Sequence, residues 1–313
     1  MAHMVETMAY AGEKPWHGLG KEVHNDLTPA QMLVEAGLDW SVDKVPAFAT
    51  IGGKKVSVGR DALVRSTDNK ILDVVSSEWN PVQNHEAFEF FTDFVMEGDM
   101  EMNTAGSLRG GQVVWALAKI KESFELFDGD RVEGYLLFTN PHKFGQCIDV
   151  RFTPIRVVCN NTLTLSLNEK GNRFVKVNHR RQFDAESVKQ TLGIASKKLG
   201  TYKEMALMLG GKRYNKSSLI SYFNDVFPVL TTKEKARKEL SKSATRALEV
   251  IDTQPGHEFA KGSWWQAYNA VTFMTDHEIG RNNDNRLTSA WFGPNSQLKV
   301  RALQSAIEYA KAA

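Results

Sequence analysis

The spacing of apolar residues changes near residue 184, and this change limits what the chain can fold into. Residues 146–153 alternate between apolar Ile148, Val150 and Phe152 and polar neighbours, a two-residue period typical of a strand with one buried face. Further along, apolar residues recur every three or four positions, at Val188, Leu192, Ala195, Leu199, Tyr202, Ala206 and Leu209. We therefore predict an α+β fold, with a sheet-rich core domain over residues 1–183 and a helical region over residues 184–313.

The first predicted hairpin lies at residues 45–58. Gly52-Gly53 separates two runs of strand-forming residues and favours a tight turn. Val56 and Val58 alternate with polar neighbours. This alternation predicts that one face of the hairpin is buried.

Further strands are predicted at residues 71–75, 112–120 and 132–139. Residues 112–120 are apolar on both alternating faces, which is typical of a strand covered on both sides. Asp128-Gly129 is a hairpin turn signal immediately before residues 132–139. The front half should therefore be a mostly antiparallel sheet with packed helices.

Two helix starts are predicted in the front half. Thr28-Pro29-Ala30-Gln31 and Asn80-Pro81-Val82-Gln83 each place a capping residue, a proline and a glutamine in the order of a capping box. Phe88, Phe91 and Phe94 follow the second start at helical spacing, and Gly98 ends the run. We expect this helix to pack its phenylalanines into the core.

In the rear half, helices are predicted at residues 231–251, 264–278 and 296–310. Residues 231–234 form a capping box, and an apolar stripe follows it at Ala236, Leu240, Ala244, Ala247 and Ile251. Gly193 and Gly200 each lower helix stability by about 1 kcal/mol, which favours two helices over one long rod in residues 188–209.

Composition excludes several classes of protein. The 313 residues are 42% apolar and 24% charged, as in a folded globular chain, and no apolar run is long enough to cross a membrane. The N-terminus lacks the layout of a signal peptide. Two cysteines, Cys147 and Cys159, are too few for a disulfide scaffold. We expect a cytoplasmic protein without membrane contact.

No strong catalytic motif is present. Gly210-Gly211-Lys212 is followed by arginine where a phosphate loop needs Ser or Thr, and residues 16–21 have no strand before them. The sequence contains no His-Glu-x-x-His motif, and Cys159 has no local partner for nucleophilic catalysis. We predict no catalytic residues, no metal and no cofactor.

Charge is segregated along the chain, although the formal net charge is only +2. Residues 1–150 hold 13 Lys/Arg against 23 Asp/Glu, whereas residues 151–218 hold 14 against 4. Such a basic block is a candidate surface for a polyanion, or else it pairs with the acidic front half within or between subunits. The residues predicted to bind nucleic acid are Arg151, Arg156, Arg173, Lys176, His179, Arg180, Arg181, Lys197 and Lys198. Arg151 alternates with Phe152 and should face solvent or a ligand.

Several segments resemble the phage/plasmid-like family known as domain of unknown function 932. They are residues 8–10 and 15–20, Arg156-Val157-Val158-Cys159-Asn160-Asn161-Thr162-Leu163, residues 262–272 with Asp276-His277, and residues 287–293. The resemblance spans nearly the whole chain in order. It implies a protein of phages, prophages or mobile elements, acting in the bacterial cytoplasm, and it supplies no catalytic residues.

The expected order of hairpin, helix and strand meander is also similar to that of single-strand annealing proteins of the Rad and RecT types. That resemblance implies ATP-independent binding of single-stranded DNA by a ring or filament of identical subunits. We therefore predict a DNA-binding recombination protein that anneals single strands as a homo-oligomer, with duplex DNA as an alternative ligand. A metal-dependent nucleic-acid enzyme and an anti-host protein-interaction factor are the other hypotheses.

Overall fold

The computed structural model describes residues 4–15, 18–127, 129–156, 161–162, 174–180, 183–192, 195–229, 240–280, 286, 289–291 and 293–312. The chain forms two compact units. Unit 1 comprises Met1–Glu122, Tyr135–Phe152 and Asn172–Ile194, and unit 2 comprises Ser123–Gly134, Thr153–Gly171 and Ala195–Ala313. These units are clusters of contacts, so the domain boundary predicted at residue 184 stays a prediction.

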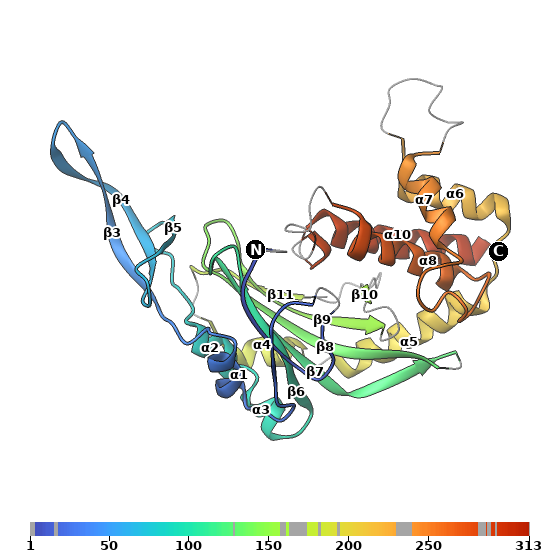
Figure 1. Ribbon diagram of the computed structural model, residues 1–313, viewed down its shortest axis with the longest axis horizontal. Coiled ribbons are helices and arrows are strands. Elements are labelled where there is room, and N and C mark those ends of the chain that lie inside the picture. The colour runs from blue at the N-terminus through green and yellow to red at the C-terminus, as the bar shows by residue number, and fades with distance from the viewer. Residues whose placement is uncertain are drawn as a thin grey trace. The chain divides into compact units, whose positions relative to one another are not determined.

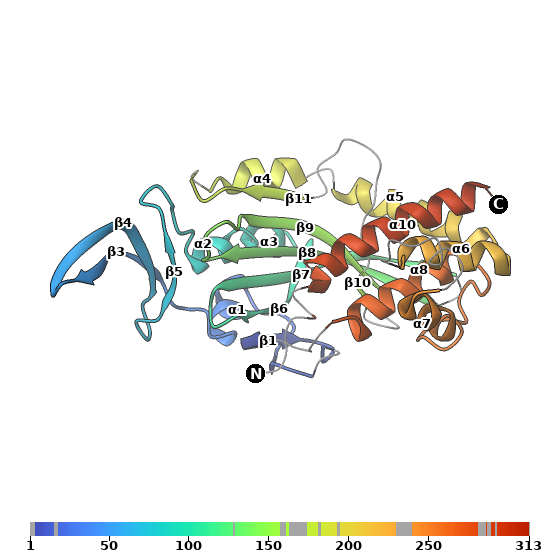
Figure 2. The same ribbon diagram turned by 90° about the horizontal axis from the view of Figure 1, so that it is seen from above.

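The larger sheet has eight strands, and the fold is α+β as predicted (Figures 1 and 2). Seven strands follow the order β10-β9-β8-β7-β6-β1-β2, and β11 pairs with β9. The strands are β1 (Val5–Ala11), β2 (Lys21–Val23), β6 (Met100–Leu108), β7 (Val113–Leu126), β8 (Asp130–Pro141), β9 (Ile148–Arg156), β10 (Asn161–Thr162) and β11 (Phe174–Val177). The β1–β2 pair is parallel, whereas β1–β6, β6–β7, β9–β10 and β9–β11 are antiparallel. Strands β7, β8 and β9 contribute residues to both units.

The apolar patterns of β7 and β9 explain their places inside the sheet. Trp115 and Ala116 point to opposite faces of β7 and are both buried, which confirms that this strand is covered on both sides. Ile148 and Val150 on β9 are fully buried, as their alternation predicts. Burial of these side chains supplies the main stabilising contribution of the sheet.

The helices of unit 1 in the described part of the chain are α1 (Pro29–Glu35), α2 (Asn84–Glu89), α3 (Thr92–Met96) and α4 (Ala185–Leu192). The predicted capping box of α1 is present: the Gln31 amide donates to Thr28 Oγ1, and the Thr28 amide donates to Gln31 Oε1. Helices α1 and α3 contact β6.

The second helix start differs from the prediction. Gln83, not Asn80, is the capping residue, because residues 80–82 are held out of the helix by bonds to other segments: the Asn80 amide donates to the His179 carbonyl, and Asn140 Nδ2 donates to the Val82 carbonyl. The predicted single helix is two short ones, α2 and α3, although Phe88 and Phe91 are buried as expected.

The smaller sheet has the order β3-β4-β5, with β3 (Val42–Ile51), β4 (Lys54–Arg65) and β5 (Ile71–Val75), and both pairs are antiparallel. This confirms the positions of the predicted hairpin and third strand. The predicted buried face is wrong: Val56 and Val58 are 44% and 48% exposed. Strand β5 pairs with β4 only at residues 61–64. Beyond that point no described strand pairs with the two-stranded ribbon.

Unit 2 is mainly helical, as the sequence predicts. Its elements are α5 (Ala195–Gly211), α6 (Lys216–Val226), α7 (Lys242–Val250), α8 (Trp264–Phe273), the π-helix η3 (Met274–Glu278) and α10 (Pro294–Ala312). Helix α8 is the centre of this unit, since it contacts α5, α7 and α10 and its residues 264–272 are buried. The Trp264 ring lies 5.5 Å from the Tyr222 ring and 5.2 Å from the Tyr309 ring.

Two helical predictions need qualification. The capping box at residues 231–234 lies outside the described residues, and α7 begins only at Lys242, where Ser241 Oγ accepts from the Ala244 amide. Ala244 and Ala247 are buried, so the predicted stripe is confirmed for this part. Helices α4 and α5 are separate, in agreement with the prediction of two pieces.

Candidate nucleic-acid interface

Arg151 is predicted from the sequence to face solvent or a ligand, but the structure pairs it with a carboxylate. Arg151 Nε lies 2.6 Å from Asp149 Oδ1, and Nη2 lies 2.5 Å from Oδ2. The two residues are two positions apart on β9, so their side chains share one face of the strand. Lys176 is exposed and lies directly across from Asp149 in the β11–β9 ladder. The charge of Arg151 is therefore largely matched within its own strand.

His179 is buried and does not present a cation. Its ring stacks on Trp79 with a centroid distance of 4.0 Å, and Nδ1 donates to the Asn80 carbonyl. Burial lowers the pKa of His179 to about 4, so the imidazole is neutral at pH 7. A neutral, enclosed imidazole does not bind backbone phosphates.

Arg180 is exposed and loosely paired. Its Nε lies 3.9 Å from Glu78 Oε2, and both side chains are more than half exposed. Such a surface pair contributes about 0–1 kcal/mol. Arg180 is consequently the member of the predicted cluster that retains the clearest access to a phosphate.

The other residues predicted to bind nucleic acid provide no further evidence for a cationic surface. Arg173 and Arg181 lie outside the described residues, as do the side chains of Arg156, Lys197 and Lys198. Arg156, Lys197 and Lys198 belong to unit 2, whereas Arg151, Lys176, His179 and Arg180 belong to unit 1.

Sequence reasoning missed a more accessible cationic surface on the β3–β4 ribbon. We call residues 42–65 the arm and residues 47–60 its tip segment. The tip segment contains Lys54, Lys55 and Arg60 and no Asp or Glu. Figure 1 shows the ribbon extending beyond the other elements of unit 1, and none of residues 47–60 is buried. Among the described residues, no carboxylate forms an ion pair with these three cations.

The arm contains a bulge that includes Arg60. The pairing passes from Pro46 opposite Asp61 to Phe48 opposite Ser57, so residues 58–60 of β4 face Ala47 alone. Gly59 in this bulge has a φ of +66°, a left-handed conformation that favours glycine. The Arg60 guanidinium lies 5.6 Å from the centroid of the Phe144 ring, which belongs to the loop after β8.

The tip carries a second cation beside an aromatic ring. Lys55 Nζ lies 4.1 Å from the centroid of the Phe48 ring. Lys55 is the diagonal neighbour of Phe48 across the ribbon, since Phe48 lies opposite Ser57. Phe48 and Phe144 are 48% and 52% exposed. Each of these phenylalanines is thus half exposed, with a cation over its ring.

The base of β4 is fixed to the large sheet through Arg65. Its guanidinium binds both carboxylate oxygens of Glu6 on β1, at 2.8 and 3.1 Å, and both oxygens of Asp68. Burial by itself raises the pKa of Glu6, but the hydrogen bond and positive charge of Arg65 outweigh it, and the pKa lies below its ordinary value. The hydrogen bond from Arg65 lowers the pKa of Asp68 to about 2. All three groups are therefore charged at neutral pH.

The base of β3 is fixed by residues 83 and 84. The Gln83 amide group exchanges two hydrogen bonds with the backbone of Val42, at 2.9 and 3.0 Å. Asn84 Nδ2 donates to the carbonyls of Leu38 and Trp40, and Asn84 Oδ1 accepts from His142 Nε2 at 3.0 Å. Both strands of the arm are thus anchored at their base.

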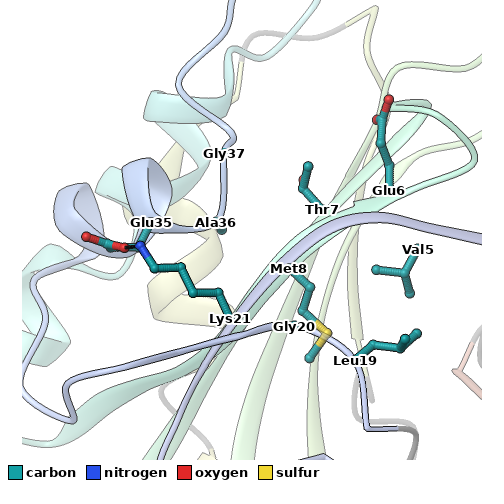
Figure 3. Close-up of a pocket in the computed structure, with 10 residues that line it drawn as sticks. All are labelled: Val5, Glu6, Thr7, Met8, Leu19, Gly20, Lys21, Glu35, Ala36 and Gly37. Atoms are coloured by element: carbon teal, nitrogen blue, oxygen red, sulfur yellow. Dashed lines mark hydrogen bonds and ion pairs between the residues drawn. The ribbon is translucent and has the colours of Figure 1, made fainter.

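Two cavities in unit 1 have the wrong electrostatics for a polyphosphate. One, of about 490 Å³, lies between β1 and the end of α1 (Figure 3); its cation Lys21 is paired with Glu35 at 2.5 Å. The other, of about 680 Å³, is lined by the carboxylates of Glu86, Glu89 and Asp93 beside Phe90. These carboxylates repel phosphate, which leaves the arm as the better candidate.

Among the described residues, no three His, Cys, Asp or Glu side chains are grouped as metal ligands. Within the same residues, no helix has the length and apolarity needed to span a membrane.

Residues 71–291 match the family described as "Domain of unknown function (DUF932)". This match covers more than half of the chain. The protein belongs to the DUF932 family. The family resemblance seen in the sequence is thereby confirmed, whereas the resemblance to single-strand annealing proteins stays a prediction. Searches of curated proteins and of solved structures each found no match.

Membership of the DUF932 family fixes no function, because the family description names none. The match begins at Ile71, after the arm ends at Arg65. The proposed interface on the arm therefore rests on the residues of this chain alone.

Proposed function

We propose that this DUF932 protein binds nucleic acid and that the arm makes the main contact. The observation that carries the proposal is the tip segment, which presents three cations and no carboxylate on an exposed ribbon. Lysine and arginine bind backbone phosphates and release the condensed counterions, which is the largest sequence-independent contribution to affinity. Arg180 supplies a further exposed cation on unit 1.

The ligand we propose is single-stranded DNA, with duplex DNA as the alternative. The activity we propose is ATP-independent annealing by a homo-oligomer of a phage or mobile-element protein. Two features of the sequence support this: it has no complete phosphate loop, and its acidic front half and basic middle segment allow neighbouring subunits to pair. The hypotheses of a metal-dependent nucleic-acid enzyme and of an anti-host interaction factor stay predictions.

The proposal is tested by titrating a labelled single strand and following its fluorescence anisotropy at several salt concentrations. We expect wild-type affinity to fall as salt rises from about 50 to 200 mM, because each phosphate bound by the protein releases counterions. Lys54→Glu with Lys55→Glu should weaken binding and make the logarithmic salt slope shallower by about 1.4, at about 0.7 for each single-strand phosphate that the variant no longer neutralises.

The matched control is Lys261→Glu with Lys311→Glu, which changes the net charge equally at two exposed positions in unit 2. This variant should keep the wild-type salt slope. Equally weakened binding in the two double variants would show that net charge matters and the arm does not. Absence of binding by the wild-type protein at low salt would refute the proposed function itself.

A further inference from the structure

We infer that the arm binds unpaired bases, which stack on the rings of Phe48 and Phe144 while Lys55 and Arg60 hold the adjoining phosphates. This inference rests on the proposed function and specifies the ligand as single-stranded nucleic acid. Its basis is the repeated arrangement of a half-exposed phenylalanine with a cation over its ring. Aromatic rings beside cations are the combination that single-strand-binding proteins use.

The exposure of the two rings needs an explanation. Phenylalanine is normally buried, and a half-exposed ring forgoes part of the stabilisation that burial would give. Phe48 is on β3 with its ring toward Lys55, and Phe144 is in a loop whose backbone is fixed, since the Phe144 amide donates to Asp73 Oδ2 at 2.8 Å. Both rings are therefore presented to solvent by ordered backbone.

The bulge at residues 58–60 supports a binding role for the second pair. A regular antiparallel pairing of β3 and β4 would need neither the extra residues nor the left-handed conformation of Gly59. A Cβ atom added at Gly59 would have no other heavy atom within 4 Å. The glycine is thus required by its backbone conformation and not by crowding. Bulges often redirect side chains at functional sites, and this bulge includes Arg60, whose guanidinium lies over the Phe144 ring.

The two ring–cation pairs involve nearby positions of β4. Ser57, opposite Phe48, and Arg60 are three residues apart, which is about 10 Å along a strand. We expect one strand of nucleic acid that follows the arm to reach both pairs. A duplex offers no free base faces to either ring.

The absence of Asp and Glu from the tip segment favours an anionic occupant. A second copy of this chain is the alternative occupant, because exposed Ile51 and Val58 also lie on the arm. The experiment therefore measures both binding of oligonucleotides and self-association.

The test compares Phe48→Leu and Phe144→Leu with the wild type, using three probes: a thymidine oligomer, an abasic oligomer of equal length, and a duplex. We expect each variant to bind the thymidine oligomer about 5- to 150-fold more weakly, the range that corresponds to stacking of about 1–3 kcal/mol per base. The salt slope should be unchanged, because the leucine variants keep every cation that neutralises a phosphate. Affinity for the abasic oligomer should change little.

Three further variants separate stacking from a structural effect. Phe48→Trp and Phe144→Tyr keep a flat ring and should restore wild-type affinity, and the Phe48→Trp fluorescence should be quenched by the thymidine oligomer and not by the abasic one. Met96→Ala removes an exposed apolar side chain elsewhere in unit 1 and should bind as the wild type does.

Several results would overturn the inference while leaving the proposed function intact. They are equal wild-type affinity for thymidine and abasic oligomers, a preference for the duplex, and unaltered binding by both leucine variants. A fall in oligomeric mass with unchanged DNA affinity in Phe48→Leu would instead assign the arm to a second copy. Failure of the wild type to bind any probe would refute the proposed function.

Discussion

At the scale of single residues, burial decides whether a histidine carries a charge. His142 and His179 illustrate this, since both are within the sheet-rich unit and nearly fully buried. Their Nε2 and Nδ1 atoms donate to Asn84 Oδ1 and to the Asn80 carbonyl, which fixes a neutral tautomer for each ring. Asn140 Nδ2 donates to the Val82 carbonyl, so the three side chains together bind residues 80, 82 and 84.

From the burial of these two histidines we predict that the free energy of unfolding decreases in mild acid. Burial, followed by the nearby His179, lowers the pKa of His142 to about 3, and burial lowers that of His179 to about 4. The unfolded chain takes up protons from about pH 6.5 downward, but the folded chain does not. The free energy of unfolding should therefore be highest above pH 6.5 and fall as the pH falls toward 4.

The expected decrease between neutral pH and pH 5 is about 2 kcal/mol for each histidine, at about 1.4 kcal/mol per pKa unit. Urea unfolding followed by circular dichroism at pH 7, 6 and 5 measures it. Replacing both histidines with Gln should flatten the pH dependence, whereas His85→Gln, at an exposed position, should not. An unchanged slope in the double variant would show that other groups control acid stability.

At the scale of secondary structure, the two short helices α2 and α3 place phenylalanines in the core of unit 1. Phe91 is fully buried, with its ring 5.3 Å from Phe90 and 6.1 Å from Phe138.

Phe91→Ala should lower the free energy of unfolding by about 3–5 kcal/mol, as for other large-to-small core changes. Phe94→Ala, at a half-buried position, is the matched control and should lower it less. A wild-type melting temperature in Phe91→Ala would contradict this account of the core.

The sequence predicts the strands well because a two-residue period depends only on local alternation. It correctly places β7, β9 and the β3–β4 hairpin, and it identifies the capping box of α1. Alternation shows which residues share a face and not whether anything covers that face, so the expected burial of Val56 and Val58 is wrong. The start of α2 at Asn84 depends on bonds from distant His179 and Asn140, which local capping signals do not include.

The candidate site is harder to predict, because it too depends partly on contacts between distant segments of the chain. Arg151 and Asp149 are two residues apart on one strand, and this spacing is available in the sequence as a sign of pairing. The burial of His179 against Trp79 depends on tertiary packing and has no local signal. The tip segment does carry a signal, because three cations follow its Gly-Gly turn and the segment has no carboxylate.

At the scale of the whole molecule, the segregation of charge bears on assembly. Residues 1–150 hold 13 Lys/Arg against 23 Asp/Glu, whereas residues 151–218 hold 14 against 4. Surfaces of opposite sign in different places favour head-to-tail contacts between copies. We expect native mass spectrometry at low salt to show a homo-oligomer, and high salt to dissociate it; a monomer under both conditions would contradict the predicted ring or filament.

The central claim is that the arm contacts nucleic acid, and photochemical crosslinking tests it most directly. An oligomer carrying a photoreactive thymidine analogue is irradiated with the full-length protein, and the crosslinked peptides are identified by mass spectrometry. Our account predicts crosslinks within residues 47–60 and at Phe144, which disappear when Lys54 and Lys55 are replaced by Glu. Crosslinks confined to other segments, such as the one around Arg180, would contradict it.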